Sequence, residues 1–342
     1  MHNRSLRWLV VTAAVVGLLG LAVVAVFGQQ VGTKDHPLYM LFPPSTNGAA
    51  VQKIGAQIAE DLYKRTGLYI KPVLEADYAA MIEAFAASDG DTFGVPTTNM
   101  YLSIYNRTNG NVTPRLGAVR YGYAYYFSSI YYWRDSGIKS VKDLAGKVWI
   151  YNDPESTSGY VLPSLLWKKV GLTFDQNHIV ETGGHTNSMV ALLNHQGDFC
   201  TGYGSPPIPP KGYNLQWKYG DDPELWIWDR YNHKLFRPGL RGKCVDLRYA
   251  VHKTFDEDKV LTEIGVLTTI GPVPNDCLAF GPNFPKNLED KIVAAVKAQF
   301  QDPKMKALWG DPEFYEWKGV QDIDDSFYDG YRELLGQPVP KR

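Results

Sequence analysis

Apolar positions in the first third of the chain follow two alternating periods, which predicts strands and helices in turn. The apolar run 37–42 is typical of a strand, and apolar residues recur at helical spacing from Val51 to Leu62. Asn47 can cap the start of this helix, and Gly67 is a natural stop. The runs 68–74, 78–88 and 92–96 then predict a strand, a helix that Asp77 caps, and another strand. This order predicts parallel βαβ units and an α/β sheet.

The same alternation continues beyond residue 120, with one long interruption. A tyrosine-rich run at 123–133 predicts a strand. A further strand is predicted at 148–152, and helices are predicted at 161–172 and 185–193. Between about 206 and 259, Pro, Gly, Trp and charged residues mix without any period, so this segment is predicted to be an irregular insertion. Regular patterns resume near 261 and end in an amphipathic helix at 287–303.

The N-terminal segment, residues 1–29, is predicted to be a signal peptide or membrane anchor. Arg4 and Arg7 precede an uninterrupted apolar run from Trp8 to Phe27. A cationic start followed by such a run is typical of an export signal, and about 20 apolar residues are also enough to span a bilayer. Because the arginines stay on the cytoplasmic side, the remainder of the chain is expected outside the membrane.

Composition excludes some functions and leaves others open. The 342 residues carry a net charge of −1, so no basic field is available for binding nucleic acid. The seven histidines show no metal-ligand spacing, and we expect neither a metal nor a cofactor. Three cysteines in an exported protein allow one disulfide with one thiol left over. The sequence does not determine the pair, and we favour Cys200 with Cys244 because it would tie down the irregular segment.

The stretch "YNDPESTSGYVLP", 151–163, places Ser156, Thr157 and Ser158 where a predicted strand passes into a predicted helix. These hydroxyls could simply cap the first turn of the helix. They could also converge with exposed backbone amides on a negatively charged ligand, since helix N-termini attract anions. The residues alone leave both interpretations open.

Several motifs in this order resemble one known family. The markers are "EADYAAMIEAF", "DSGIKSVKDLAGK", "DPESTSGYVLP", "GGHTNSMVALLNHQGDF" and "IGPVPND", spread over about 38–308 outside the insertion. The sequence resembles the phosphate-, phosphite- and phosphonate-binding components of ABC importers, which are type 2 periplasmic binding proteins. The resemblance implies a monomer that binds a small anionic ligand outside the membrane and delivers it to a membrane permease.

The family's fold has two α/β lobes joined by two crossing strands, with the ligand in the cleft between them. On this resemblance, lobe 1 is expected to take 36–130 plus 271–342, and lobe 2 to take 131–270. Ligands in open α/β sheets bind beyond the carboxyl ends of strands, beside helix N-termini, which agrees with the position of the serine-rich motif.

The resemblance also implies which residues line the cleft. Ser156, Thr157 and Ser158 are expected to bind the anion through hydroxyl and amide groups, together with His185 from the next strand-to-helix junction. From lobe 1 we expect the phenol of Tyr78, a second phenol from either Tyr125 or Tyr126, and the carboxylate of Asp276. Outside the resemblance, each has an ordinary structural role: a helix cap for His185, a core residue for the tyrosines, a turn former for Asp276.

One position departs from relatives that bind aminoalkylphosphonates. Those relatives have a glutamate, which pairs with the ligand's ammonium, where this chain has Ser205. The substitution argues against an aminophosphonate and leaves phosphate, phosphite, a simple alkylphosphonate or another small molecule. The insertion, with Trp217, Trp226 and Trp228, is a candidate for reshaping the cleft wall.

Two other classes of function compete with binding and transport. The chain contains the residue types of a hydrolytic triad in Ser158, His185 and Asp153. It has no G-x-S-x-G nucleophile elbow, however, so we do not expect the protein to be an enzyme. A membrane-tethered sensory binding domain would use the same fold, as would a binding protein for a different small ligand, because fold alone does not determine function.

Overall fold

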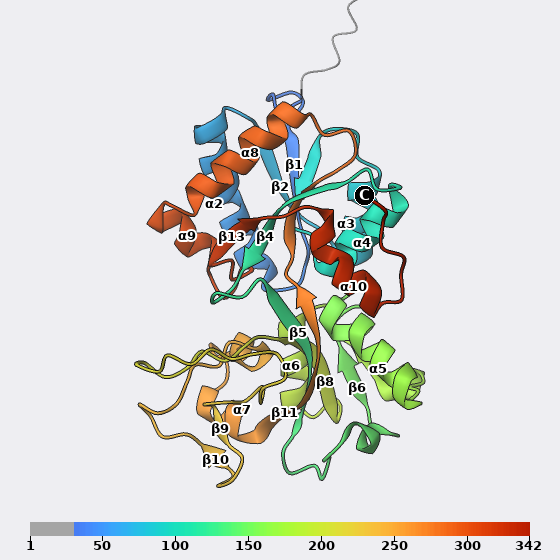
Figure 1. Cartoon of the computed structure of the whole chain (residues 1–342), viewed down its shortest axis with the longest axis vertical. Coiled ribbons are helices and arrows are strands. Elements are labelled where there is room, and N and C mark those ends of the chain that lie inside the picture. Colours follow the sequence, from blue (N-terminus) through green and yellow to red (C-terminus); the bar gives the residue numbers. More distant parts are fainter. Residues whose placement is uncertain (1–30) are drawn as a thin grey trace, which may run out of the picture.

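The computed structural model describes residues 31–342 and consists of two α/β lobes, one above the other in Figure 1. The predicted signal or anchor at 1–29 lies outside the described residues. We call the part built on a six-stranded sheet lobe 1 and the part built on a five-stranded sheet lobe 2. The predicted two-lobed α/β architecture is therefore confirmed.

Lobe 1 has a mixed sheet with helices on both faces. The strand order is β13–β4–β12–β3–β1–β2, and β1 pairs in parallel with both β2 and β3. The strands are β1 (Leu38–Phe42), β2 (Ile70–Leu74), β3 (Thr92–Gly94), β4 (Thr113–Val119), β12 (Cys277–Phe280) and β13 (Gly319–Asp322). The helices are α2 (Gly48–Thr66), α3 (Tyr78–Ala86), α4 (Thr98–Arg107), α8 (Lys286–Gln299), α9 (Pro303–Trp309) and α10 (Asp329–Leu334).

Alternation along β1 explains why both faces of this sheet are covered. Leu38, Met40 and Phe42 belong to the core under α2, α8 and α9, whereas Leu41 belongs to the core under α3, α4 and α10. Successive side chains of a strand point to opposite faces, so a continuously apolar strand requires helices on both sides. The predicted signals for α2 are confirmed: Asn47 accepts a hydrogen bond from the Ala50 amide, and Gly67 adopts a left-handed conformation.

Lobe 2 repeats this plan on a smaller sheet with the strand order β11–β5–β8–β6–β7. The strands are β5 (Tyr125–Trp133), β6 (Trp149–Tyr151), β7 (Ile179–Glu181), β8 (Phe199–Gly204) and β11 (Ile264–Pro274). Its helices are α5 (Leu162–Val170), α6 (His185–Leu193) and α7 (Glu257–Glu263). Neighbouring residues of β5 again face opposite cores, with Ile130 packed on the α5 side and Tyr131 on the α6 side.

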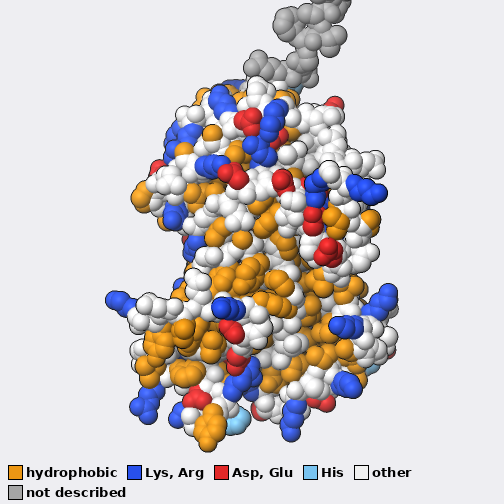
Figure 2. All heavy atoms as spheres, in the orientation of Figure 1, with side chains coloured by type: hydrophobic (Ala, Val, Ile, Leu, Met, Phe, Trp, Pro, Cys, Tyr) orange, Lys and Arg blue, Asp and Glu red, His pale blue; other side chains and the backbone are white. Residues whose placement is uncertain are grey.

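Two strands connect the lobes, as predicted. β5 follows β4 of lobe 1, and β11 returns the chain to β12 of lobe 1 (Figure 1). β5 and β11 pair antiparallel along most of their length, from Trp133 with Ile264 to Tyr125 with Pro274. The crossing therefore consists of two hydrogen-bonded strands at the waist of the molecule, where Figure 2 shows hydrophobic side chains gathered between the lobes.

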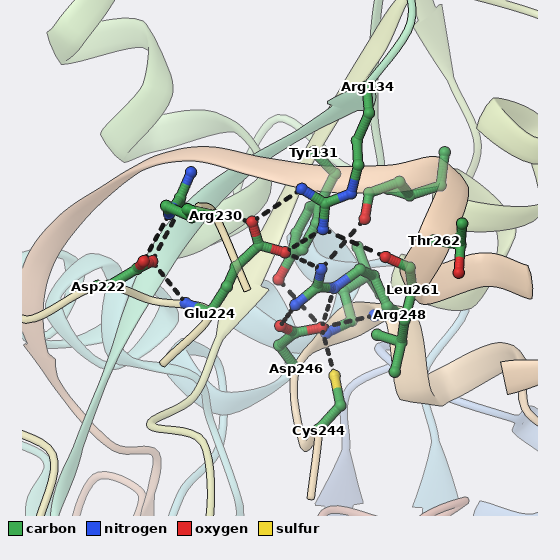
Figure 3. A network of polar contacts seen from close by, with 12 residues as sticks. Tyr131, Arg134, Asp222, Glu224, Arg230, Cys244, Asp246, Arg248, Leu261 and Thr262 are labelled. Atoms are coloured by element: carbon green, nitrogen blue, oxygen red, sulfur yellow. Dashed lines mark hydrogen bonds and ion pairs between the residues drawn. The ribbon is translucent and has the colours of Figure 1, made fainter. Parts of the chain in front are cut away.

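The predicted irregular insertion has little regular structure, and a buried ionic network fixes it to lobe 2. Its only strands within the described chain are the two-residue β9 (Trp228–Asp229) and β10 (Lys234–Leu235). The carboxylate of Glu224 is fully buried and contacts Arg134 at the end of β5 and Arg248 (Figure 3). Arg248 also binds Asp246 with an N–O distance of 2.8 Å. Charges buried this completely are compensated by direct pairing.

The expected Cys200–Cys244 disulfide is wrong. Cys200, Cys244 and Cys277 are all buried free thiols. Cys200 lies on β8, opposite Tyr131 of β5, while the thiol of Cys244 donates to Asp246 in the ionic network at 3.2 Å. The insertion is therefore held by ion pairs and packing rather than by a disulfide.

Among residues 31–342, none of the helices combines the length and apolar character needed to cross a bilayer. In the same part of the chain, His, Cys, Asp and Glu side chains form no cluster of three or more that could hold a metal ion.

Candidate functional site

A cavity lies between the lobes, beside the crossing strands. Its volume is about 90 Å³, several times the roughly 10–15 Å³ that one buried water needs, so it can hold a small ligand. Lobe 2 contributes neutral polar groups, and lobe 1 contributes aromatic and charged groups. The residues that line it include Tyr78, Arg120, Tyr126, Ser156, Thr157, Ser158, His185, Tyr203, Ser205, Asp276, Phe314, Tyr315 and Glu316.

The serine-rich motif forms a tight turn that leads into α5. The Ser156 hydroxyl accepts a hydrogen bond from the Gly159 amide at 3.1 Å, and the Ser156 carbonyl accepts from Tyr160 and Val161. These contacts close a π-turn over Thr157–Val161, so α5 starts only at Leu162, next to Pro163, as the proline predicts. Only glycine fits at 159, because a Cβ there would lie 1.7 Å from Oδ1 of Asn152.

This turn leaves hydrogen-bond donors at the cavity. Within the described chain, the backbone amides of Thr157 and Ser158 and the hydroxyl of Ser158 have no protein partner. The Ser158 carbonyl is held in place by the Ser128 hydroxyl at 2.7 Å. Free amides at the first turn of a helix carry partial positive charge, which favours an anion. Ser156 therefore caps the turn, as the first interpretation predicts, while its neighbours keep donors free, and the anion site stays a prediction.

Thr157 has a further role that the sequence did not reveal. Its hydroxyl oxygen accepts a hydrogen bond of 2.9 Å from the backbone amide of Asn99, in the first turn of α4 in lobe 1. The Asn99 side chain donates to the carbonyl and the carboxylate of Glu155 at 3.2 and 3.1 Å. The serine-rich turn therefore contacts lobe 1 directly at one edge of the cavity.

His185 lines the cavity at the first position of α6, after Gly184. Burial lowers the pKa of His185 to about 4, so its imidazole is neutral near pH 7. Its Nδ1 is buried and has no hydrogen-bond partner among residues 31–342. The ring packs edge-on against Tyr203 with centroids 5.3 Å apart. A neutral imidazole can still donate one N–H to an anion.

The structure distinguishes between the candidate phenols. Tyr78 and Tyr126 line the cavity, and Asn152 donates to the Tyr78 hydroxyl at 3.4 Å across the lobes. Burial raises the pKa of Tyr126 to about 12, so its hydroxyl keeps its proton and can donate. Tyr125 does not line the cavity. It points to the other side of β5, where it packs edge-on against Tyr123.

Asp276 lines the cavity, but its carboxylate is occupied by protein groups. Arg120 donates to its two oxygens at 2.8 and 2.7 Å, and the Trp317 indole donates to one of them at 2.7 Å. Arg120 in turn is oriented by the Tyr315 carbonyl at 2.9 Å. Arg120 is a cavity residue that sequence reasoning missed, because it precedes its partner by 156 positions and lies in no motif.

Further lining residues come from segments that the sequence did not mark as functional. Phe314, Tyr315 and Glu316 lie in an irregular stretch between α9 and β13, and Tyr203 lies near the end of β8. Ser205, the position where the resemblance implies a glutamate in relatives that bind aminophosphonates, also lines the cavity. The cavity lining does not include Trp217, Trp226 or Trp228, so the expectation that they reshape the wall is wrong. Trp217 and Trp226 instead pack on Phe127 of β5.

The residue types of a hydrolytic triad are present but not assembled. No hydrogen bond joins Ser158 to His185, or His185 to Asp153, within the part of the chain that the structure describes. Asp153 instead accepts from the Glu155 amide at 2.7 Å, which shapes the turn before Ser156. A Ser-His-Asp relay requires both contacts.

Comparison with known protein families identifies the family of this chain. The model of a family described as the periplasmic substrate-binding protein of phosphonate ABC transporters matches residues 40–328. The chain belongs to this family. Family membership makes it a solute-binding component of an ABC importer, the function that the sequence motifs predict.

Individual relatives are more distant. The phosphate-import protein PhnD of Mycolicibacterium smegmatis is 28% identical over 175 residues, which cover 47% of this chain and 52% of that protein. The aligned region thus spans about half the length of this curated relative.

Two solved structures share the fold of this binding protein. The binding component of a Pseudomonas aeruginosa phosphonate transporter has a TM-score of 0.64 and 16% identity, covering 87% of this chain and 85% of that one. PhnD1 of Prochlorococcus marinus, solved with methylphosphonate, has a TM-score of 0.61 and 11% identity, covering 88% and 98%. At these identities the likeness extends to the fold alone.

Proposed function

We propose that this binding protein captures a small phosphorus oxyanion, either phosphate, phosphite or a phosphonate, in the cavity between its lobes. The observation that carries the proposal is the set of free donors at Thr157 and Ser158, at a helix N-terminus inside that cavity. Its relatives' names agree, since one is a phosphate-import protein and another was solved with methylphosphonate.

The oxyanion would lie between neutral donors of lobe 2 and two phenols, one from lobe 1 and one from the crossing strand β5. Ser156 shapes the turn, Thr157 and Ser158 donate to the anion, and His185 offers an N–H. Tyr78 approaches from lobe 1, and Tyr126 approaches from the crossing strand β5. Hydrogen bonds to charged acceptors are stronger than neutral ones, so uncharged donors can hold an anion once the lobes exclude water. Asp276 acts indirectly, by orienting Arg120.

The protein would work outside the cytoplasmic membrane, directed there by its N-terminal apolar segment, and would deliver its ligand as a monomer to a membrane permease. Ligand contacts from both lobes favour the closed form, and hinge motion about β5 and β11 releases the ligand. No enzymatic step and no nucleic acid are involved in this proposal.

Calorimetric titration of the purified protein with phosphate, phosphite, methylphosphonate and aminoethylphosphonate tests the proposal. We expect saturable binding of at least one of these, weakened about 10- to 100-fold in Ser158→Ala, because one hydrogen bond to a charged group contributes about 1.5–3 kcal/mol. Ser136→Ala, an exposed serine outside the cavity, is the matched control. Absence of heat with all four ligands would remove the oxyanion assignment and leave the fold intact.

A further inference from the structure

The charged side chains that line the cavity all come from lobe 1, and their charges do not balance. They are Arg120, Asp276 and Glu316, while lobe 2 contributes the neutral His185. Arg120 and Asp276 form a bidentate pair and cancel one another. Glu316 therefore gives the lining a net charge of −1, although the family binds anions.

Glu316 has no cationic partner within ion-pair distance among residues 31–342. One carboxylate oxygen accepts from the Tyr121 phenol at 2.7 Å, and the other accepts no hydrogen bond from the described part of the chain. Besides Tyr121, the titratable or charged groups facing it are Arg120, Tyr203 and Lys318. The Lys318 ammonium instead bonds to the Gly310 carbonyl and lies over the Tyr121 ring, 5.4 Å from its centroid.

The backbone at this position supports a dedicated role. Glu316 and Tyr121 both have positive φ, of 52° each, a conformation that side-chain-bearing residues adopt rarely. Such conformations persist where the surrounding structure imposes them, and they concentrate at binding sites. The hydrogen bond between Tyr121 and Glu316 joins these two residues, so the Glu316 carboxylate has a fixed position in the cavity wall.

This geometry has a consequence for the ligand. A fixed carboxylate repels an anion that offers only acceptors and attracts one that offers a donor. Building on the proposed function, we propose that Glu316 makes the cavity selective for oxyanions that carry a hydrogen-bond donor. The donor is either a P–OH group or an ammonium on the phosphorus substituent. Glu316 supplies the acceptor that Ser205 does not.

Ligands of different chemistry distinguish a P–OH donor from an ammonium donor. Sulfate offers no donor near neutral pH, and methylphosphonate has a P–OH only as the monoanion. Phosphate keeps a P–OH even as the dianion, and aminoethylphosphonate keeps its ammonium. We would titrate all four ligands calorimetrically into the wild type, Glu316→Gln and the control Glu333→Gln, at pH values on both sides of the second phosphorus ionisation. Glu333 is exposed on α10, outside the cavity.

For the wild type and the control we expect sulfate to bind at least about tenfold more weakly than phosphate. If the donor is a P–OH group, the affinity of the protein for methylphosphonate should fall about tenfold per pH unit above the ligand's second pKa. The reason is that only the ligand form that keeps the P–OH proton can donate to Glu316. With ammonium as the donor, aminoethylphosphonate binds about tenfold more tightly than methylphosphonate at the higher pH. In Glu316→Gln these differences shrink to less than about threefold, since an amide can donate as well as accept.

If Glu316→Gln discriminates among the four ligands as the wild type does, the proposal is overturned while oxyanion binding stands. If the wild type binds none of them, both this proposal and the proposed function are overturned. Should Glu316→Gln fail to fold, Tyr121→Phe provides the second variant, because it releases the carboxylate without removing it. Unchanged selectivity in Tyr121→Phe would likewise contradict the proposal.

Discussion

The hydroxyl of Thr157 accepts a hydrogen bond of 2.9 Å from the backbone amide of Asn99, and this contact joins the two lobes beside the cavity. It gives the middle residue of the serine-rich motif a role different from that of its neighbours. Ser156 closes the turn, Ser158 keeps a free hydroxyl, and Thr157 fastens the turn to α4. Under the proposed function, ligand binding and lobe closure would be coupled within three consecutive residues.

Replacing Thr157 by valine should weaken ligand binding by disfavouring the closed form. The variant keeps the shape of the side chain but leaves the Asn99 amide without an acceptor in the closed state. Burying an unpaired donor costs about 1–3 kcal/mol, so calorimetry should show about a 5- to 100-fold loss of affinity. Thr157→Ser, which retains the hydroxyl, is the control and should bind within about threefold of the wild type. Equal affinities for the two variants would show that the contact does not favour closure.

His185 should make the folded state sensitive to mild acid. Burial lowers its pKa from 6.5 to about 4, so the unfolded chain binds a proton that the folded chain does not bind between these values. The free energy of unfolding should therefore fall as pH decreases from 6.5 towards 4, by roughly 2–3 kcal/mol from this residue. Urea unfolding at a series of pH values measures this decrease. In His185→Gln, the free energy of unfolding should depend less on pH between 6.5 and 4. An identical slope in the variant would contradict the assignment.

Removing the carboxylate of Glu224 should destabilise the protein strongly. Its side chain is fully buried and pairs with Arg134, Arg230 and Arg248, so Glu224→Gln removes the negative charge that these guanidinium groups share (Figure 3). Breaking a buried ion pair in this way costs about 3–5 kcal/mol. Chemical denaturation measures the loss. Glu313→Gln, which removes the exposed ion pair with Lys253, should cost at most about 1 kcal/mol. Similar losses in both variants would contradict the structural role of the network.

The three thiols should be free and unreactive in the folded protein. Cys200, Cys244 and Cys277 are buried, and burial raises the pKa of each thiol, so little thiolate is available. A thiol reagent should label none of them under native conditions and all three after unfolding without reductant. Labelling of a single thiol after unfolding would reveal a disulfide and contradict the structure.

Much of the fold could be predicted from the sequence because its signals are local. Asn47 and Gly67 bound α2 as their capping chemistry predicts, and the alternation of strands and helices indicates the α/β class. Ser156 and Ser158 could be placed at the cavity because they stand at a strand-to-helix junction, whereas His185 was expected there from the family resemblance. Parallel strands bring such junctions to one edge of the sheet.

The rest of the site depends on contacts between distant residues. Arg120 is fixed by Asp276, and Glu316 by Tyr121, pairs that are 156 and 195 positions apart. The stretch around Glu316 has no period that would mark it. Tyr125 and Tyr126 could not be separated because an unbroken tyrosine run hides which face of the strand each side chain occupies. The ion pair between Arg134 and Glu224, which are 90 positions apart, is likewise non-local.

The most direct test of the account is a crystal structure of the protein with methylphosphonate or phosphate bound. We expect the phosphorus oxyanion in the cavity between the lobes, with its oxygens within hydrogen-bond distance of the Ser158 hydroxyl and of the Thr157 and Ser158 amides. An anion bound elsewhere, or an empty cavity at saturating ligand, would contradict the claim that this turn is the anion site.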